Sequence, residues 1–491
     1  MPKSQYVDPA KAFESGYIKF DDIPVCQYNK TLKEETKIYS KQDMLRIYRD
    51  MAIIREFETM LNEVKTKSEY NGVQYNNPGP AHLSIGQEAS AVGEAYCLDI
   101  NDLSFGSHRS HGEILAKGLS SIEKLDDKEL YDIMKEFLDG AVLNVVEKHM
   151  NAGGNVKELA INFLLYGALA EIFARKTGFN RGLGGSMHAF FIPFGLMPNN
   201  AIVGASGPIA LGAALYKRSN HKPGIIVSNF GDGATGRGPV LESMNFASMD
   251  QITKLWGMDG KYENGGLPIL FNVFNNHYGM GGQTRGETMG YDMVARLGAG
   301  FNPEQMHAER VNGYDPLAVI DAVTRKKKLL LEGKGPALLD VVTYRVSGHS
   351  PSDSSTYRTA EEIEAWKNAD PIEAYKAKLV MGGVAKLEEF DAIKEDIVKR
   401  MTEIMKLAIN DEISPRMDLD KEPDAISSIM FSNQKVKSMD TTREPDMLMP
   451  KEECPVVLSP ALNTLKTGLR FALISPVLKL CSRQPRLTLR V

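Results

Sequence analysis

The stretches GIIVSNFGDGATG (residues 224–236) and LPILFNVFNNHYGM (residues 267–280) decide the fold of this chain. Each opens with apolar residues over the length of a buried strand, and each ends in a turn rich in glycine or asparagine. A helical segment separates them, as in two parallel strands joined by a crossover. Parallel strands end at the same edge of a sheet, where open α/β folds bind ligands. The sequence therefore predicts an α/β fold with a ligand site at this edge.

The two turns carry oxygen atoms that suit a magnesium ion. Asp232 follows the first strand, Asn276 follows the second, and backbone carbonyl groups lie close to both in the sequence. Mg²⁺ prefers such hard oxygen ligands and commonly keeps phosphate oxygens in its coordination shell. We therefore expect a magnesium and diphosphate site at these strand ends.

Residues 231–236 also match the G-x-G-x-x-G pattern of dinucleotide-binding turns. A carboxylate inside such a turn would repel a pyrophosphate that rests on backbone N–H groups. A divalent cation between Asp232 and the phosphate removes this repulsion. The metal interpretation is therefore favoured over a dinucleotide site, and a tight turn without a ligand is the remaining alternative.

Composition excludes several classes of function. The chain has 491 residues, a formal net charge of -5 and no basic stripe, so we expect no nucleic-acid partner. Its four cysteines are far apart and form no Cys-x-x-Cys pair, which favours a reducing compartment over a disulfide framework. We find no signal-peptide core and no apolar run of membrane-spanning length. These features predict a cytoplasmic protein with no membrane partner.

The order of polar and periodic segments divides the chain into three parts. Residues 1–39 are polar and irregular and are expected to form an N-terminal arm, whereas residues 40–410 alternate strands and helices as one large domain. Within that domain we expect a helical insertion near 126–170 and a loop insertion near 250–266.

Residues 411–491 form the third part and are predicted to be a linker or C-terminal extension, punctuated by prolines. No acidic residue follows Glu453, while lysines and arginines accumulate. A basic interaction tail is one interpretation, and an aberrant end after about residue 454, as from a shifted reading frame, is the other. The mass of the native polypeptide decides between them.

Three further segments carry residues suited to phosphate or proton chemistry. A loop rich in proline and glycine presents His82, and a short turn before a helix contains His108, Arg109 and His111. Arginine is the side chain best shaped for bidentate contact with phosphate. His349 follows the predicted strand at 337–344, so a parallel strand would bring it to the same edge as Asp232.

Seven motifs occur together in one order along the chain: HLSIGQEA (82–89), HRSHG (108–112), GGSMH (184–188), AIVGA (201–205), GDGA (231–234), NNHYGM (275–280) and GHSPSD (348–353). Jointly they resemble the alpha subunit of the thiamine diphosphate-dependent 2-oxo acid dehydrogenases, over residues 40–410. The resemblance implies the thiamine diphosphate-binding fold of the diphosphate-binding type, a mainly parallel sheet with helices on both faces.

The resemblance also assigns roles to residues of this chain. Asp232, Asn276 and the backbone oxygen of Tyr278 would hold Mg²⁺, and His349 would be the active-site histidine. His82, His111 and His188 are further candidates for the substrate pocket. Ser350 stands where some family members are phosphorylated. The residues expected to contact thiamine diphosphate are His108, Arg109, Val203, Asp232, Gly233, Ala234, Asn276, Tyr278 and His349.

The implied reaction is the oxidative decarboxylation of a 2-oxo acid with transfer of the acyl group to a lipoyl arm. The cofactor supplies the electron sink, and His349 suits proton control because histidine titrates near neutral pH. The family's cofactor-activating glutamate comes from a beta subunit or beta-like domain, which we do not find in this chain. We therefore expect a heterotetramer that serves a lipoyl-bearing acyltransferase.

Two alternative functions stay open from the sequence. A transketolase-like transferase would use the same cofactor site, although the loop at His349 and Ser350 favours the dehydrogenase type. A cofactor-binding half kept as a scaffold or fragment is the non-enzymatic alternative. Which 2-oxo acid or acetoin-type substrate is used depends on side chains from both subunits.

Overall fold

The computed structural model describes residues 6–255 and 265–429, and a six-stranded sheet in which all neighbouring strands are parallel lies at its centre. The strand order is β4-β3-β5-β6-β8-β7. As predicted, β5 is parallel to β6 and pairs with it along the whole length of β5, so the turns that follow the two strands meet at one edge of the sheet. The strands are β3 (Leu103–Phe105), β4 (Leu196–Met197), β5 (Ile226–Gly231), β6 (Ile269–Asn275), β7 (Glu309–Asn312) and β8 (Ala337–Val342).

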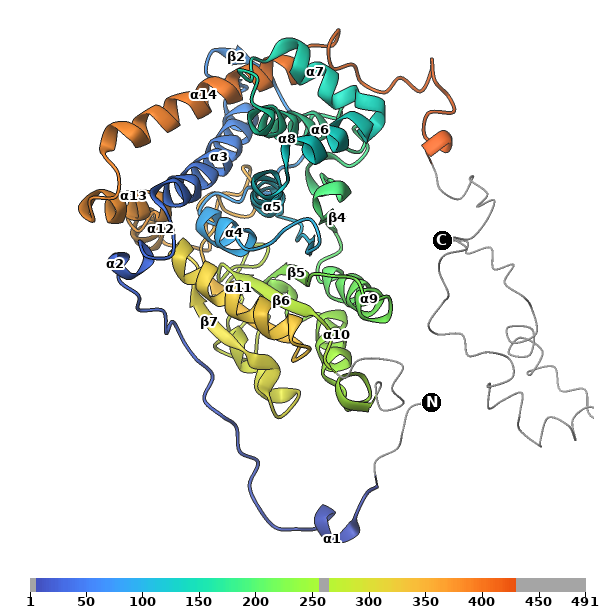
Figure 1. The fold of residues 1–491 in the computed structure, drawn as a ribbon, viewed down its shortest axis with the longest axis vertical. Coiled ribbons are helices and arrows are strands. Elements are labelled where there is room, and N and C mark those ends of the chain that lie inside the picture. The colour runs from blue at the N-terminus through green and yellow to red at the C-terminus, as the bar shows by residue number, and fades with distance from the viewer. Residues whose placement is uncertain (1–5, 256–264, 430–491) are drawn as a thin grey trace, which may run out of the picture. The chain divides into compact units, whose positions relative to one another are not determined.

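Helices cover both faces of this sheet (Figure 1). Side chains of a strand alternate between faces, so Phe230 and Phe271 pack into one apolar cluster while Val227 and Leu270 pack into the other. The first cluster includes residues of α9 (Ser206–Ser219) and α10 (Gly238–Ser248), and the second includes residues of α11 (Pro316–Leu331), which contacts α4 (Glu88–Ala95). The predicted parallel α/β fold with helices on both faces is confirmed.

A second group of helices gathers at one end of the sheet and shares its own apolar core (Figure 1). Its long helix α3 begins at the predicted cap, where Ser40 accepts the N–H of Asp43 at 3.1 Å and Asp43 accepts the N–H of Ser40 at 2.9 Å. Most of the segment 126–170 is helical, with a break at residues 150–155. These helices are α3 (Lys41–Thr66), α5 (His111–Lys124), α6 (Asp127–Glu136), α7 (Ala141–His149), α8 (Val156–Ile172) and α14 (Leu387–Ile409).

The remaining elements are short or peripheral. They are α1 (Pro9–Ala12), α2 (Leu32–Glu35), β1 (Glu69–Tyr70), β2 (Val73–Gln74), η1 (Phe137–Gly140), η2 (Gly185–Met187), η3 (Ile192–Phe194), η4 (Asp232–Ala234), η5 (Gln251–Leu255), η6 (Val294–Gly300), η7 (Gln305–His307), α12 (Ala360–Asn368), α13 (Pro371–Met381) and η8 (Ser427–Ile429). Within the two described ranges, the helices lack the combination of length and apolar character that a membrane crossing requires.

The chain divides into two compact units, one of residues 1–218 and 222–417 and one of residues 219–221 and 418–491. The polar N-terminal segment pairs with the edge strand β7, because Cys26 donates its N–H to the carbonyl of Arg310 at 2.8 Å. The predicted boundaries at residues 39 and 410 and the two predicted insertions stay predictions. Residues 256–264 and 430–491, which include most of the second insertion and the questioned tail, lie outside the described residues.

Candidate active site

The ends of β5 and β6 bring Asp232 and Asn276 together at the carboxyl edge of the sheet. The Asp232 side chain is fully buried and accepts the backbone N–H of Asn276 at 3.2 Å and the hydroxyl of Thr284. Asn276 in turn accepts the N–H of Tyr278 through its side-chain oxygen at 3.2 Å. The Asp232 carboxylate and the Asn276 side-chain oxygen therefore lie at the strand ends where the sequence predicts a cation.

Burial raises the pKa of Asp232 to about 6, although the hydrogen bonds from Thr284 and Asn276 act in the opposite direction. A carboxylate in this position would be stabilised by a divalent cation. In the described part of the chain, no three His, Cys, Asp or Glu side chains cluster as a metal site on their own. A cation here would therefore depend on amide, carbonyl and phosphate oxygens as well as on Asp232.

A cavity of about 390 Å³ opens beside these strand ends and holds most of the predicted site residues. Among the described residues that line it, Asp232 is the only carboxylate, and two buried arginines lie in the wall. Its lining includes His82, Ser107, His108, Arg109, Met187, Val203, Asp232, Gly233, Ala234, Arg237, Asn276, Tyr278, Met280, Arg345 and His349.

Arg109 supplies positive charge to this cavity. Its side chain is 5% exposed and donates to the carbonyl oxygens of Leu83 at 2.8 Å and His349 at 2.9 Å. Burial and the nearby charge of Arg345 lower the pKa of Arg109 to about 9. Because these hydrogen bonds go to neutral carbonyl groups, the charge of Arg109 remains available for an anion.

Arg345 is a second buried cation of the cavity, and it is absent from the predicted site. It donates to the carbonyl of Gly279 at 2.8 Å and to the hydroxyl of Tyr357 at 2.7 Å, while its Nε is buried without a hydrogen-bond partner. Burial lowers its pKa. Arg345 follows the end of β8 by three residues and precedes His349 by four. Its place after a buried strand could therefore have predicted it as a site residue from the sequence.

Three imidazole rings meet in the same cavity. The ring of His82 lies 5.2 Å from that of His108 and 4.9 Å from that of His349, measured between centroids. Burial and the charge of Arg109 lower the pKa values of His82, His108 and His349 to about 4, 3 and 4. All three rings are therefore neutral near pH 7.

The tautomer of His349 follows from its neighbour. Arg345 has only N–H donors, and its Nη1 lies 3.4 Å from Nδ1 of His349. Nδ1 is therefore the acceptor, and Nε2 carries the proton. Asp353 holds the same loop by accepting the N–H of His349 at 2.7 Å, and its hydrogen bonds outweigh burial and lower its pKa to about 2.

His111 does not line the cavity, although the sequence placed it among the catalytic candidates. Its Nδ1 lies 3.1 Å from Glu58 of α3, and its Nε2 lies 3.0 Å from the carbonyl oxygen of Ser186. Burial lowers the pKa of His111, but the interaction with Glu58 outweighs it and the net shift is upward. The geometry favours a supporting role for His111, and a catalytic one stays a prediction.

The glycine loop before η2 is built around a buried carboxylate, Glu171. One oxygen accepts the N–H groups of Asn180 at 2.7 Å and Gly182 at 2.9 Å, and the other accepts those of Gly184 at 2.6 Å and Gly185 at 3.3 Å. A Cβ atom at Gly184 would lie 2.4 Å from a backbone oxygen, so glycine is required there. The loop leads to Met187 in the cavity wall.

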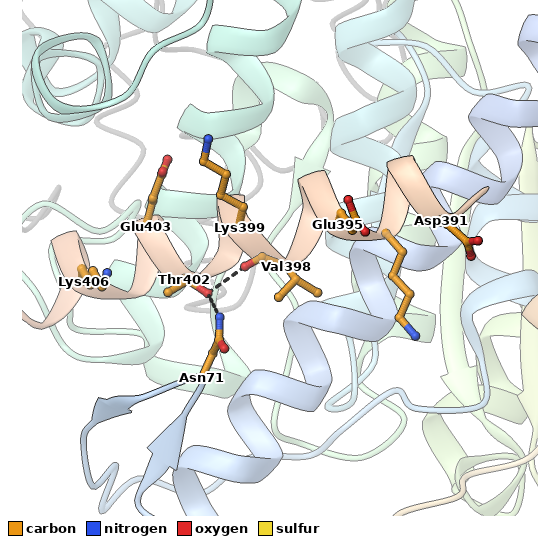
Figure 2. A pocket seen from close by; sticks show the side chains of 9 residues that line it. Asn71, Asp391, Glu395, Val398, Lys399, Thr402, Glu403 and Lys406 are labelled. Carbon is orange, nitrogen blue, oxygen red and sulfur yellow. Dashed lines mark hydrogen bonds between the residues drawn. The ribbon is translucent and has the colours of Figure 1, made fainter. Parts of the chain in front are cut away.

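A wider groove of about 630 Å³ lies on α14 and the β1–β2 hairpin (Figure 2), and it shares no lining residue with the cavity. Asn71 donates to the hydroxyl of Thr402 at 2.7 Å, and the other lining side chains are mainly exposed charges of α14. The charged side chains are Asp391, Lys394, Glu395, Lys399, Glu403 and Lys406. Solvated charges of both signs do not form a reaction site, so the chemistry belongs to the buried cavity.

The fold and the cavity define a class of protein, an α/β enzyme that places one buried carboxylate and two arginines at parallel strand ends. Residues 157–416 match the model of the family described as dehydrogenase E1 component, and this chain belongs to that family. It is an alpha-subunit component of a 2-oxo acid dehydrogenase, as the resemblance implied, and the family implies thiamine diphosphate as cofactor.

Curated relatives extend the match beyond that segment. The chain is 31% identical to the pyruvate dehydrogenase E1 component subunit alpha type I of Ascaris suum over 77% of each chain. It is 31% identical to the mitochondrial alpha subunit of Saccharomyces cerevisiae over 88% of this chain and 81% of the relative. Identity to the alpha subunit of Rhizobium meliloti is 30%, over 73% of this chain and 83% of the relative.

Proposed function

We propose that this chain binds thiamine diphosphate through Mg²⁺ and, with a beta subunit, decarboxylates pyruvate or a closely related 2-oxo acid. One observation carries the proposal: the buried oxygens of Asp232 and Asn276 share a single cavity with the buried cations Arg109 and Arg345. That arrangement suits a metal ion beside a diphosphate. Pyruvate is inferred from the names of the relatives.

Each part of the cavity has a defined task in this proposal. Asp232, Asn276 and the Tyr278 carbonyl would hold Mg²⁺, while Arg109 and the backbone of Gly233 and Ala234 would bind the diphosphate. When bound, thiamine diphosphate supplies the electron sink for loss of CO₂. The Nε2–H of neutral His349 is suited to donate a hydrogen bond to an oxygen on which negative charge develops.

Two features of the cavity support a partner subunit: its described lining residues include a single carboxylate, and its rim exposes apolar side chains. Asp232 is the only carboxylate among its described lining residues and would hold the cation, so the activating glutamate would come from the beta subunit. Ile202 and Met280, both in the lining, are 72% and 84% exposed. A beta subunit that covers this apolar rim would complete the site of a heterotetramer, which then transfers the acyl group to a lipoyl-bearing acyltransferase.

Reconstitution tests the proposal. The purified chain with Mg²⁺, thiamine diphosphate and an artificial electron acceptor should oxidise pyruvate only after a candidate beta subunit is added. A panel of 2-oxo acids and acetoin then ranks the substrates. Lack of thiamine diphosphate binding with every candidate partner would contradict the proposal, and the transketolase-like and non-catalytic alternatives are not favoured by the relatives.

Phosphorylation of Ser350 is proposed as a control of the same cavity. Ser350 is half-buried on the His349 loop, with its hydroxyl oxygen 3.1 Å from that of Ser352. A phosphate would add about -1.5 to -2 charges beside buried arginines and compete with an anionic ligand. Ser350→Glu should therefore lower turnover, and equal kcat and KM in variant and wild type would count against this control.

The cytoplasmic location stays a prediction that we carry forward as a proposal. Most of the named relatives are mitochondrial, whereas the name of the Rhizobium meliloti relative contains no organelle. Fractionation of the native source, with an antibody against this chain, decides between cytoplasm and organelle. Recovery in an organelle fraction would overturn the proposal.

A further inference from the structure

The residues at the end of β6 line two different cavities in alternation. Asn276 and Tyr278 line the cavity already described, whereas Asn275 and His277 line a second cavity of about 210 Å³. The two cavities share no described lining residue. A single stretch of chain therefore separates the second cavity from the predicted cation position.

Thr284 belongs to the lining of the second cavity and also contacts the first. Its backbone N–H donates to the carbonyl of His277 at 2.9 Å, and its buried hydroxyl donates to Asp232. Asp232 and His349 do not line the second cavity. A ligand bound there would therefore lie beside the reaction site without taking part in the reaction.

Arg310 of β7 lines the second cavity with a guanidinium group whose hydrogen-bond donors are not used. Its side chain is 15% exposed, and its ion-pair partner among the described residues is Asp340, with Nη1 and Oδ2 3.5 Å apart. This separation exceeds the about 2.7–3.2 Å of a normal N–H···O hydrogen bond. Because a guanidinium has several N–H donors, Arg310 can bind a further acceptor.

Asp340 holds Arg310 at the wall without entering the cavity. The carboxylate is fully buried and is not part of the described lining. It accepts the side-chain amide of Asn275 at 2.8 Å and the backbone N–H of Ala295 at 3.3 Å. These contacts fix the carboxylate behind Arg310.

Arg285 is the second cation of the lining, and it leaves the cavity with excess positive charge. Its side chain is exposed and makes no hydrogen bond or ion pair within the described ranges. Asp292, the carboxylate of the described lining, lies 3.6 Å from Arg296, which balances its charge. Since Asp340 balances Arg310, the charge of Arg285 remains unbalanced.

These groups suit a small oxyanion. The planar fork of an arginine matches the oxygens of a phosphate or a carboxylate, and the lining also contains the neutral polar side chains of Gln283 and His277. Pockets for drug-sized ligands begin at about 300 Å³. The second cavity is smaller, so it has room for a phosphate or a short carboxylate but not for a nucleotide.

We propose that this second cavity is a binding site for a small oxyanion, a phosphate group or a carboxylate, held by Arg285 and Arg310. The site is separate from the proposed cofactor site and does not depend on the proposed function. It places the anion one stretch of chain away from the predicted cation position.

Titration calorimetry with inorganic phosphate tests the proposal. The assembled enzyme is first saturated with Mg²⁺ and thiamine diphosphate, which fill the first cavity under the proposed function, and ionic strength is held constant. The wild type should bind phosphate under these conditions. Arg285→Gln should weaken this binding about tenfold, because a charge-assisted hydrogen bond is lost.

A second variant and a matched control accompany Arg285→Gln. Arg310→Lys keeps a positive charge opposite Asp340 but loses the bidentate fork, so it should also weaken phosphate binding about tenfold. Arg416→Gln removes the charge of an exposed arginine that lines neither cavity, and it should bind phosphate like wild type. Circular dichroism verifies that each variant is folded. A parallel titration with acetate distinguishes a carboxylate from a phosphate as the better ligand.

The site is supported if either anion binds and both Arg285→Gln and Arg310→Lys weaken that binding. It is overturned if neither anion binds, or if both variants bind as tightly as wild type. If the wild-type enzyme does not bind thiamine diphosphate, the proposed function fails. The comparison of Arg285→Gln with Arg416→Gln then still decides whether the oxyanion site exists.

Discussion

At the scale of single residues, the site is defined by polar groups that are buried but not paired with one another. Asp232 is buried with hydrogen-bond donors around it, and Arg109 and Arg345 are buried against carbonyl and hydroxyl oxygens. Burying a charge is costly unless a partner offsets the cost. A metal ion would offset the cost of burying the negative charge of Asp232. An anionic ligand would offset the cost of burying the positive charges of Arg109 and Arg345.

His349→Ala should lower kcat about a hundredfold while the Kd for thiamine diphosphate changes less than about threefold. The reason is that Arg109 bonds the backbone oxygen of His349, which the substitution keeps, whereas the ring supplies the Nε2–H. Turnover in the reconstituted enzyme and calorimetric binding give the two numbers. His149→Ala, an exposed histidine at the end of α7, is the control, and a parallel loss of binding would refute the assignment.

The low pKa of His108 predicts an acid-sensitive fold. The folded value is about 3, and an unfolded chain has about 6.5, so the unfolded state binds more protons as the pH falls from about 6.5 toward 3. The free energy of unfolding should therefore decrease by up to about 1.4 kcal/mol per pH unit from this residue. In His108→Asn, urea unfolding at pH 7 and pH 5 should show a smaller difference than in wild type.

His149→Asn, at an exposed histidine of α7, is the matched control variant. An identical slope in His108→Asn and wild type would show that His108 is not buried as a neutral ring.

Residue positions were predictable where they follow directly from strand ends. Asp232, Asn276 and His349 each come after an apolar strand, and parallel pairing brings such positions together. Thr284, which donates to Asp232, could not be predicted, since a loop outside regular structure returns it to the strand end. The contact of His111 with Glu58 could not be predicted either, because Glu58 lies on another helix, 53 residues away.

At the scale of elements, the glycine loop shows how one side chain can organise a segment without regular structure. The sequence predicts a glycine loop at residues 182–188, but it does not indicate that Glu171 of α8 lies inside it. That contact depends on the packing of the helix end against the loop. Four backbone N–H groups on one carboxylate leave the loop little freedom.

Glu171→Gln should loosen this loop, because the amide nitrogen cannot accept hydrogen bonds and leaves up to two N–H groups unpaired. Each buried unpaired group costs about 1–3 kcal/mol. Limited trypsin cleavage after Arg181, inside the loop, should become several-fold faster. Glu158→Gln on the same helix, where the glutamate bonds Arg400, is the control, and equal cleavage rates in all three proteins would contradict this role.

At the scale of the whole molecule, the fold class was predictable because strands and helices alternate and the strands are apolar on both faces. The edge strands were harder, since β4 has two residues and β7 has four. Such short strands leave almost no periodic signal. An insertion is defined by comparison with related sequences and not by a local pattern. The boundaries of the two predicted insertions could therefore not be determined from this sequence alone.

The apolar rim of the cavity predicts how the enzyme assembles. Replacing Ile202 and Met280 together by glutamate should weaken binding to the beta subunit at least tenfold, because charges at a buried interface core are costly. The free energy of unfolding of the isolated chain should stay unchanged, since both side chains are exposed. Met381→Glu, at an equally exposed methionine of α13, is the control in sedimentation or calorimetric assembly assays.

If the double variant assembles as tightly as wild type, the partner does not cover this rim.

The central claim is that the strand ends hold Mg²⁺ and a diphosphate together. Its most direct test is calorimetric binding of thiamine diphosphate to the assembled enzyme, with and without Mg²⁺, for wild type and Asp232→Ala. We predict Mg²⁺-dependent binding in the wild type and none detectable in the variant, with folding verified by circular dichroism. Equal, Mg²⁺-dependent affinity in both proteins would contradict the account.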